Sequence, residues 1–281
     1  MGRGGLIVVL VAWAGEAHAG AWLQAKGERL LIATTDYTIA DEAFDDERAA
    51  TIDVEFRKVD ARTYAEWGLW DWLTLTQESA YQDVWFEGLA GQSAYSGPSA
   101  FRTGARSSLL RRGRHRVSFA VDAGYQRGGE FISDGELGYE GWSGTGTLLY
   151  GYGWERAYVD LQAGYRYRFG QGPDTWRLDG TVGYDLTDRW SVTASASGRQ
   201  TGGDRLGIDL LKPTQSLKVK GSVQYRLNCR TRLEAGGLYT AWGRNYVRER
   251  GATISLWRSF GKGTKARCFE RKYRHVGRPI Q

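Results

Sequence analysis

The three histidines, His18, His115 and His275, are the residues best suited to catalysis in this chain. A histidine can support hydrolysis of a peptide or acyl bond when a serine or carboxylate partner lies beside it. His18 lies in a predicted leader peptide and His275 in a basic tail, and no such partner cluster surrounds His115. The sequence therefore predicts no catalytic site. A surface enzyme that hydrolyses lipid or peptide through His115 is the alternative.

Metal and cofactor chemistry has little support in the sequence. Cys229 and Cys268 lack a metal-site spacing such as C-x-x-C, and no glycine-rich phosphate loop is present. A divalent cation could bind an acidic run that contains Asp41, Glu42, Asp45, Asp46 and Glu47. Without a ligand-spaced glycine turn, a solvated acidic loop is favoured. We expect no metal and no cofactor.

Charged residues occur at every second position of several segments. Within residues 156–169, one set is Tyr158, Asp160, Gln162, Gly164, Arg166 and Arg168, and the other is Val159, Leu161, Ala163, Tyr165, Tyr167 and Phe169. A helix would mix the two sets, whereas a strand places them on opposite faces. The pattern recurs near residues 58–67, 116–123, 176–185, 217–226 and 252–260. Its length suits tilted strands that cross a bilayer and turn their polar side chains toward a lumen.

The charged side chains on the polar faces are the candidate functional residues. Those predicted to line the lumen are Lys58, Arg62, Arg102, Arg106, Arg116, Arg166, Arg168, Arg177, Lys218, Lys220, Arg226, Asp60, Asp122, Asp160 and Asp179. The basic excess suggests an anion-preferring pore. Alternatively, arginine–carboxylate pairs between strands fill the interior. A barrel of about twelve strands lies between the filled and the open kinds, and a filled or narrow lumen is favoured.

The first residues have the features of a secretory leader. Arg3 precedes a short apolar run, Leu6–Ala14, and Ala17-His18-Ala19 is an A-x-A cleavage signal. We expect cleavage before Gly20, which divides the chain into a leader (1–19), a barrel (20–260) and a tail (261–281). Beyond Gly20 no apolar stretch is long enough for a membrane-spanning helix, and the mean hydropathy is −0.49. Barrel strands average out as polar in this way.

The connections between the alternating segments are short and long in turn. Tight turns are predicted near Asp71, Gly113, Gly153, Asp188 and Asn228, and longer loops over residues 39–50, 85–100, 126–138, 170–174, 201–213 and 242–246. A repeat of about forty residues also suits a β-propeller, but a propeller blade needs four short strands. The prediction is an all-β, transmembrane, antiparallel up-and-down β-barrel of about twelve strands in the bacterial outer membrane, with both termini periplasmic. Aromatic residues near the short turns, among them Trp67, Trp70, Trp72, Trp154 and Trp190, suit a periplasmic girdle.

The net charge of +6 belongs to the tail, which has seven basic residues and one acidic residue. The rest of the chain is neutral in sum, so no nucleic-acid-binding face is expected. The tail either contacts anionic lipid headgroups or an acidic polymer, or extends as a disordered segment.

The two cysteines are predicted to form a disulfide. The turn at residues 227–230 and the tail lie at the same end of a twelve-stranded barrel, about 10 Å apart across two strands. Cys268 lies eight residues beyond Phe260, and eight extended residues can span about 25 Å. The periplasm is also oxidising. Unpaired thiols, or a bond to another chain, are the alternatives to Cys229–Cys268.

Residues 20–28 (GAWLQAKGE) and 64–75 (YAEWGLWDWLTL) resemble a family of proteobacterial outer-membrane proteins that includes XagA-like proteins. The resemblance covers most of the mature chain in layout, and it implies a barrel and no catalytic residues. Some relatives are linked by name to exopolysaccharide production. We therefore expect a structural or narrow-channel transport protein, for anionic solutes or exopolysaccharide. Its expected partners are outer-membrane lipid and the barrel-assembly machinery.

Overall fold

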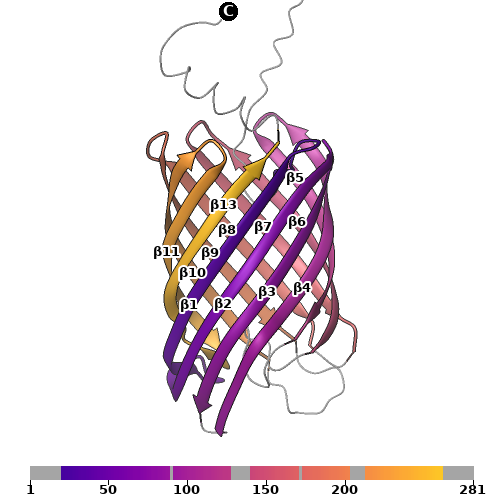
Figure 1. Ribbon diagram of the computed structural model, residues 1–281. Helices are drawn as coiled ribbons and strands as arrows, with labels where there is room; N and C mark the ends of the chain where they lie inside the picture. The colour runs from indigo at the N-terminus through magenta and orange to yellow at the C-terminus, as the bar shows by residue number, and fades with distance from the viewer. Residues whose placement is uncertain (1–19, 89–90, 128–139, 171–172, 203–212, 262–281) are drawn as a thin grey trace, which may run out of the picture.

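The computed structural model describes residues 20–88, 91–127, 140–170, 173–202 and 213–261. They form one closed antiparallel sheet of twelve long strands and one very short strand, β12 (Figure 1). The long strands are β1 (Arg29–Phe44), β2 (Ala50–Trp70), β3 (Leu73–Gly88), β4 (Gly91–Arg112), β5 (His115–Gln126), β6 (Gly141–Gly153), β7 (Ala157–Arg168), β8 (Thr175–Asp185), β9 (Trp190–Thr201), β10 (Gln215–Asn228), β11 (Thr231–Arg244) and β13 (Arg250–Phe260), and β12 is Tyr246–Val247. The predicted fold class and strand number are confirmed.

The barrel closes between its first and last long strands. β1 pairs with β2 along one edge and with β13 along the other, where Arg29 faces Phe260 and Ile39 faces Arg250. Each of the other long strands pairs with the strands before and after it in the chain. The one exception is β11, which pairs with β13 because the short β12 pairs with β1 instead. Closure leaves no long unpaired edge, as a lipid environment requires of a sheet.

The short turns follow β2, β4, β6, β8 and β10, near the five predicted positions. The first two predicted loops are wrong in extent. β1 and β2 remain paired as far as Phe44 and Ala50, and β3 and β4 as far as Gly88 and Gly91. Near their outer ends the pattern is inverted, because Phe56 and Val84 are buried inside the barrel while Glu55 and Arg57 are exposed on its outer surface. These segments therefore read as polar loops in the sequence although their backbones stay paired. β11 likewise continues to Arg244, into the last predicted loop.

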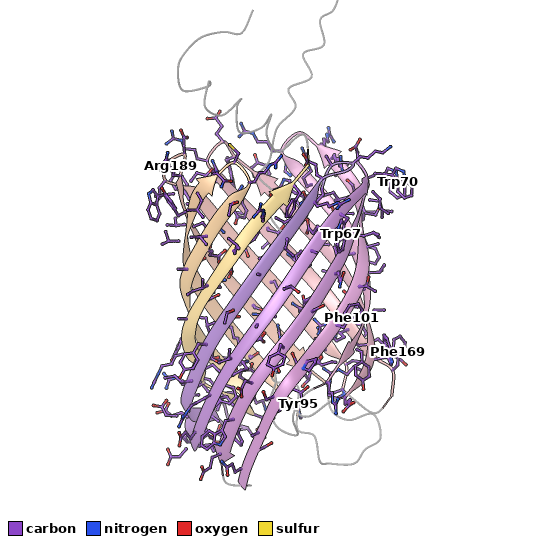
Figure 2. The ribbon with its side chains drawn as sticks, in the orientation of Figure 1. Trp67, Trp70, Tyr95, Phe101, Phe169 and Arg189 are labelled. Carbon is purple, nitrogen blue, oxygen red and sulfur yellow. The ribbon has the colours of Figure 1, made fainter. Side chains whose placement is uncertain are left out.

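The two faces of the barrel differ in chemistry. Large apolar side chains such as Phe119, Leu161, Leu178 and Ile254 are exposed, while most of the buried side chains are polar or charged. Figure 2 shows Trp70 near the short-turn rim and Phe169 near the other, both projecting outward. Trp70 and Trp72 stack at 5.4 Å between ring centroids. Soluble proteins bury their apolar side chains and expose their polar ones, and this barrel does the reverse. The arrangement matches a lipid-facing exterior and a polar lumen.

The described residues contain no helix long and apolar enough to cross a membrane. The predicted leader (1–19) and nearly all of the basic tail (261–281) lie outside the described residues.

Candidate channel lumen

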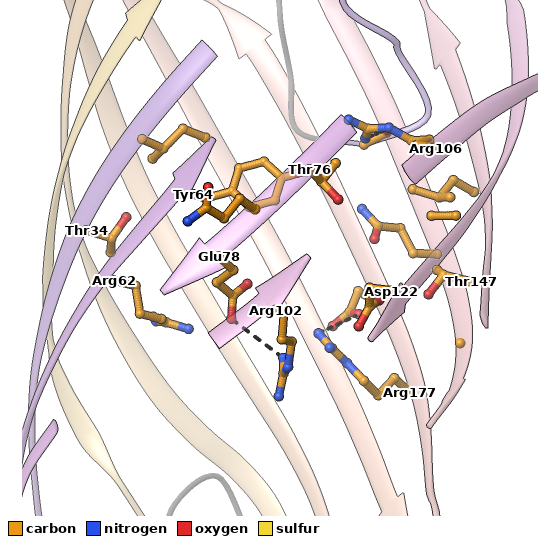
Figure 3. A pocket seen from close by; sticks show the side chains of 18 of the residues that line it. Thr34, Arg62, Tyr64, Thr76, Glu78, Arg102, Arg106, Asp122, Thr147 and Arg177 are labelled. Carbon is orange, nitrogen blue, oxygen red and sulfur yellow. Dashed lines mark hydrogen bonds and ion pairs between the residues drawn. The ribbon is translucent and has the colours of Figure 1, made fainter. Parts of the chain in front are cut away.

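A cavity of about 420 Å³ lies inside the barrel (Figure 3). Most of the barrel strands contribute to its wall. Its charged lining consists of Arg62, Arg102, Arg106, Arg177, Lys220, Glu78, Asp122, Asp179 and Glu234. With five cationic and four anionic groups, the wall is close to neutral. Such a volume is within the range of small-molecule sites.

Ion pairs cross the wall between neighbouring strands. Arg102 of β4 lies 3.6 Å from Glu78 of β3. Arg62 of β2 pairs with Asp36 of β1, and it also lies 3.3 Å from Asp60 on its own strand. Opposite charges are held together because the lumen offers less water to solvate each of them.

Arg177 of β8 has capacity left for a ligand. It lies 3.5 Å from Asp179, but its buried Nε has no hydrogen-bond partner. It is also within electrostatic range of Arg102 and Arg199, and Figure 3 shows Arg102 and Arg177 directed toward the same part of the lumen. The three guanidinium groups attract an anion, because together they carry more positive charge than their two nearby carboxylates, Glu78 and Asp179, neutralise.

Glu234 of β11 is held much more firmly. Its carboxylate accepts hydrogen bonds from Ser222 and Gln224 at 2.9 Å and from Trp257 Nε1 at 3.0 Å, and it pairs with Lys220 at 2.8 Å. Because four neighbours already bind the Glu234 carboxylate, we expect this wall of the cavity to stabilise the barrel and not to bind solute.

At the loop end, the segment between β11 and β13 folds into the barrel mouth. Tyr246, Val247 and Glu249 are almost fully buried. Val247 packs against an apolar cluster with Ala40, Phe56 and Val84. Glu249 pairs with two predicted lumen residues, Lys218 at 3.1 Å and Lys58 at 3.4 Å. The sequence did not reveal this segment, because it contains only two strand residues.

At the short-turn end, residues 20–26 enter the barrel. The Ala21 N–H donates to Asp160 Oδ2 at 2.7 Å, and Ser118 donates to the Ala21 carbonyl at 2.7 Å. Gln24 Nε2 donates to Glu66 at 2.7 Å, and Arg106 contacts both Glu66 and the Gly20 carbonyl. Gly20 also lines the cavity, so this segment forms part of its floor.

The remaining predicted lumen residues take three positions. Arg166 and Arg168 are buried on β7 toward the loop end. Arg116 donates to the carbonyls of Gly113 and His115, and Arg226 donates to that of Asp188, so both stay at the short turns. Asp122 lines the cavity. The sequence pattern separates inner from outer faces, and it does not give a residue's height in the barrel.

His115 lies among aromatic rings. Its Nδ1 is 3.0 Å from the Tyr150 hydroxyl and its ring is 4.7 Å from that of Tyr152. Across the described part of the chain, no hydrogen bond or ion pair joins His115 to a carboxylate.

The acidic residues between Asp41 and Glu47 form ion pairs with arginines and hydrogen bonds within their own loop. Asp41 pairs with Arg250, Glu42 with Arg248 and Asp46 with Arg244. Asp45 accepts the Ala49 N–H and the Thr51 hydroxyl, both at 2.9 Å. No metal-ligand cluster occurs within the described ranges.

Cys229 lies in the turn between β10 and β11 and is disulfide-bonded. Cys268 lies outside the described residues, so its role as the partner of Cys229 stays a prediction.

No protein-family model matches the sequence, and a search of curated proteins found no significant match. Solved structures share its fold. An outer-membrane channel from Pseudomonas putida F1 has a TM-score of 0.67 at 13% identity, over 87% of this chain and 99% of that one. The NanC porin has a TM-score of 0.55 at 9% identity, over 81% and 98%. The translocator domain of the autotransporter NalP from Neisseria meningitidis has 0.51 at 11%, over 84% and 90%. The chain is a twelve-stranded β-barrel of the bacterial outer-membrane type.

Proposed function

We propose that this protein is a narrow outer-membrane channel for small solutes that carry a carboxylate or another anionic group. The supporting observation is the pair of guanidinium groups, Arg102 and Arg177, at the central cavity, with Arg177 Nε left without a hydrogen-bond partner. A bound carboxylate can accept two parallel N–H bonds from such a group. The channel named in the Pseudomonas putida F1 structure and the porin fold of NanC agree with this role.

The cavity favours a small solute over a polymer. A volume of about 420 Å³ accommodates a molecule near the lower end of the ligand sizes that proteins enclose. A polysaccharide chain would have to pass the segments at both mouths simultaneously. We therefore rank exopolysaccharide export below passage of a small anion.

The anion preference is expected to be modest, because five cationic groups face four anionic ones along the wall. Most of the positive charge is compensated locally by Glu78, Asp179 and Glu234. Selectivity then depends on the two guanidinium groups rather than on a strong overall field.

Planar-bilayer recording tests the proposal. Under a salt gradient, the reversal potential of the wild-type channel is expected to indicate anion preference. Arg102→Gln combined with Arg177→Gln is expected to shift it toward cations. Arg57→Gln is the matched control, because Arg57 is exposed and its contacts with Glu55 and the Trp85 ring lie at the outer surface, away from the lumen.

Two outcomes would overturn the proposal. An unchanged reversal potential in the double variant removes the arginine pair as the selectivity element, and no conductance in any variant favours a purely structural barrel. Hydrolysis of lipid or peptide that is lost in His115→Ala would support the surface-enzyme alternative.

A further inference from the structure

We propose that residues 20–26 form a plug, and that the α-amino group created by leader cleavage before Gly20 locks it by pairing with Asp160. The proposal goes beyond solute selectivity, and it rests on the proposed channel function and on the predicted cleavage site. Cleavage would then do more than remove a leader: it would supply the charge that holds the plug in the lumen.

The segment is bound on many sides. Its hydrogen bonds reach Glu66 on β2, Thr74 on β3, Arg106 on β4, Ser118 on β5 and Asp160 on β7. Gly20, Ala21 and Gln24 are buried. A loose N-terminal extension would not bury main-chain groups against five strands, so this segment occupies a defined binding site inside the barrel.

Glycines on the barrel wall leave space for residues 20–26. A Cβ atom on Gly68 would overlap the Ala25 carbonyl, and one on Gly151 would lie 2.7 Å from the Trp22 ring. Trp22 packs edge-on against Tyr158 at 6.0 Å between centroids. The wall is therefore shaped to accept both the backbone and the large side chain of the segment.

Asp160 needs a cation that its barrel neighbours do not supply. Asp160 is 3% exposed, and its carboxylate accepts hydrogen bonds from two neutral donors, the Ala21 N–H and Gln162 Nε2, each at 2.7 Å. Arg106 acts on it only at longer range, and no lysine or arginine of the described ranges forms an ion pair with it. A buried carboxylate without a cationic partner is costly.

The processed terminus brings that cation to the right place. A Cβ atom on Gly20 would overlap the Asp160 carboxylate, and standard backbone geometry puts the Gly20 nitrogen about 2.5 Å from that Cβ position, hence within about 5 Å of the carboxylate. An α-amino group is mostly protonated at neutral pH. The overlap also explains why the first mature residue has no side chain.

The test uses mature protein purified from outer membranes and recorded in planar bilayers. Asp160→Asn removes the anionic partner, and Gly20→Ala displaces the terminus sterically. Deletion of residues 20–26 removes the plug. All three are expected to raise conductance or open probability several-fold. Asp83→Asn, the same change at an exposed position at the outer end of β3, is the control and should match wild type.

A second measurement does not depend on conduction. A small amine-acetylating reagent should leave the α-amino group of the folded wild-type protein unmodified and should modify it in Asp160→Asn, with peptide mapping as the readout. Heat-modifiable gel mobility confirms that each variant is a folded barrel.

Three results would overturn the plug. They are a mature terminus at a residue other than Gly20, an α-amino group equally reactive in wild type and Asp160→Asn, and equal conductance in wild type and the deletion variant. If wild type and deletion both fail to conduct, the channel function fails. If they conduct equally, the channel function stands and only the plug fails.

Discussion

Lys58 Nζ lies 3.4 Å from Glu249 Oε2, and the two side chains are only 4% and 1% exposed. Glu249 also receives Lys218 at 3.1 Å, so one carboxylate fixes two ammonium groups inside the loop-side mouth. The acidic residue belongs to the short segment between β12 and β13, and the lysines belong to β2 and β10. These contacts join the segment to two strands that are four apart around the closed barrel.

Glu249→Gln should therefore destabilise the barrel. Breaking a buried ion pair from one side leaves the other charge uncompensated, at a typical cost of about 3–5 kcal/mol. Denaturant unfolding in detergent micelles, followed by tryptophan fluorescence, measures the loss. Glu55→Gln, which breaks the exposed pair with Arg57, should change stability much less, because solvent screens a pair at the surface. Equal effects of the two substitutions would contradict the role of Glu249.

Gly251→Ala should weaken the seam between β13 and β1. Its Cβ would overlap the backbone carbonyl of Tyr37 and lie 2.8 Å from Thr38 Cγ2, and backbone cannot move aside as a side-chain end can. Overpacking of this kind costs about 1–3 kcal/mol. Gly221→Ala is the control, since no atom lies within 4 Å of its Cβ position. The expected readout is a lower temperature for the loss of heat-modifiable mobility in Gly251→Ala alone.

The loop between β1 and β2 should lose order in acid. Hydrogen bonds from the Ala49 N–H and the Thr51 hydroxyl lower the pKa of Asp45 below its ordinary value. A folded-state pKa below the unfolded one gives stabilisation that is complete above the unfolded pKa and is lost as pH falls through the folded pKa. Carboxyl NMR should show Asp45 titrating below the usual aspartate range, and Asp45→Asn should remove that signal. A midpoint at or above that range would contradict the assignment.

The disulfide Cys229–Cys268 is checked by mass spectrometry of non-reduced mature protein. We expect one linked peptide pair joining the β10–β11 turn to the tail. Cys229→Ser should leave one alkylatable thiol and release the tail, which limited proteolysis then removes more rapidly. Two alkylatable cysteines in the wild-type protein would refute the bond.

Much of the fold follows from local sequence. In β7, Asp160, Arg166 and Arg168 point inward and Leu161, Tyr165 and Tyr167 outward, as alternation predicts, because the side-chain period of a strand is two. The position of the short turns follows from the same pattern.

The alternating pattern does not predict which segments fill the lumen. Residues 20–26 have no periodicity, and the hydrogen bond from Ala21 to Asp160 joins residues 139 positions apart. Glu249 likewise lies outside any alternating run, and its partners become neighbours only when the barrel closes. Such contacts depend on the diameter and stagger of the closed sheet, which no local pattern encodes.

The cavity lies between two obstructions made by the chain itself, residues 20–26 at the short-turn end and the β12 segment at the loop end. Separate contacts hold the two segments: a hydrogen bond to Asp160 at one end, and the ion pairs of Glu249 at the other. Opening one end consequently leaves the other in place. In the proposed channel, a substitution that widens one mouth therefore leaves the other mouth to set the largest solute that can pass.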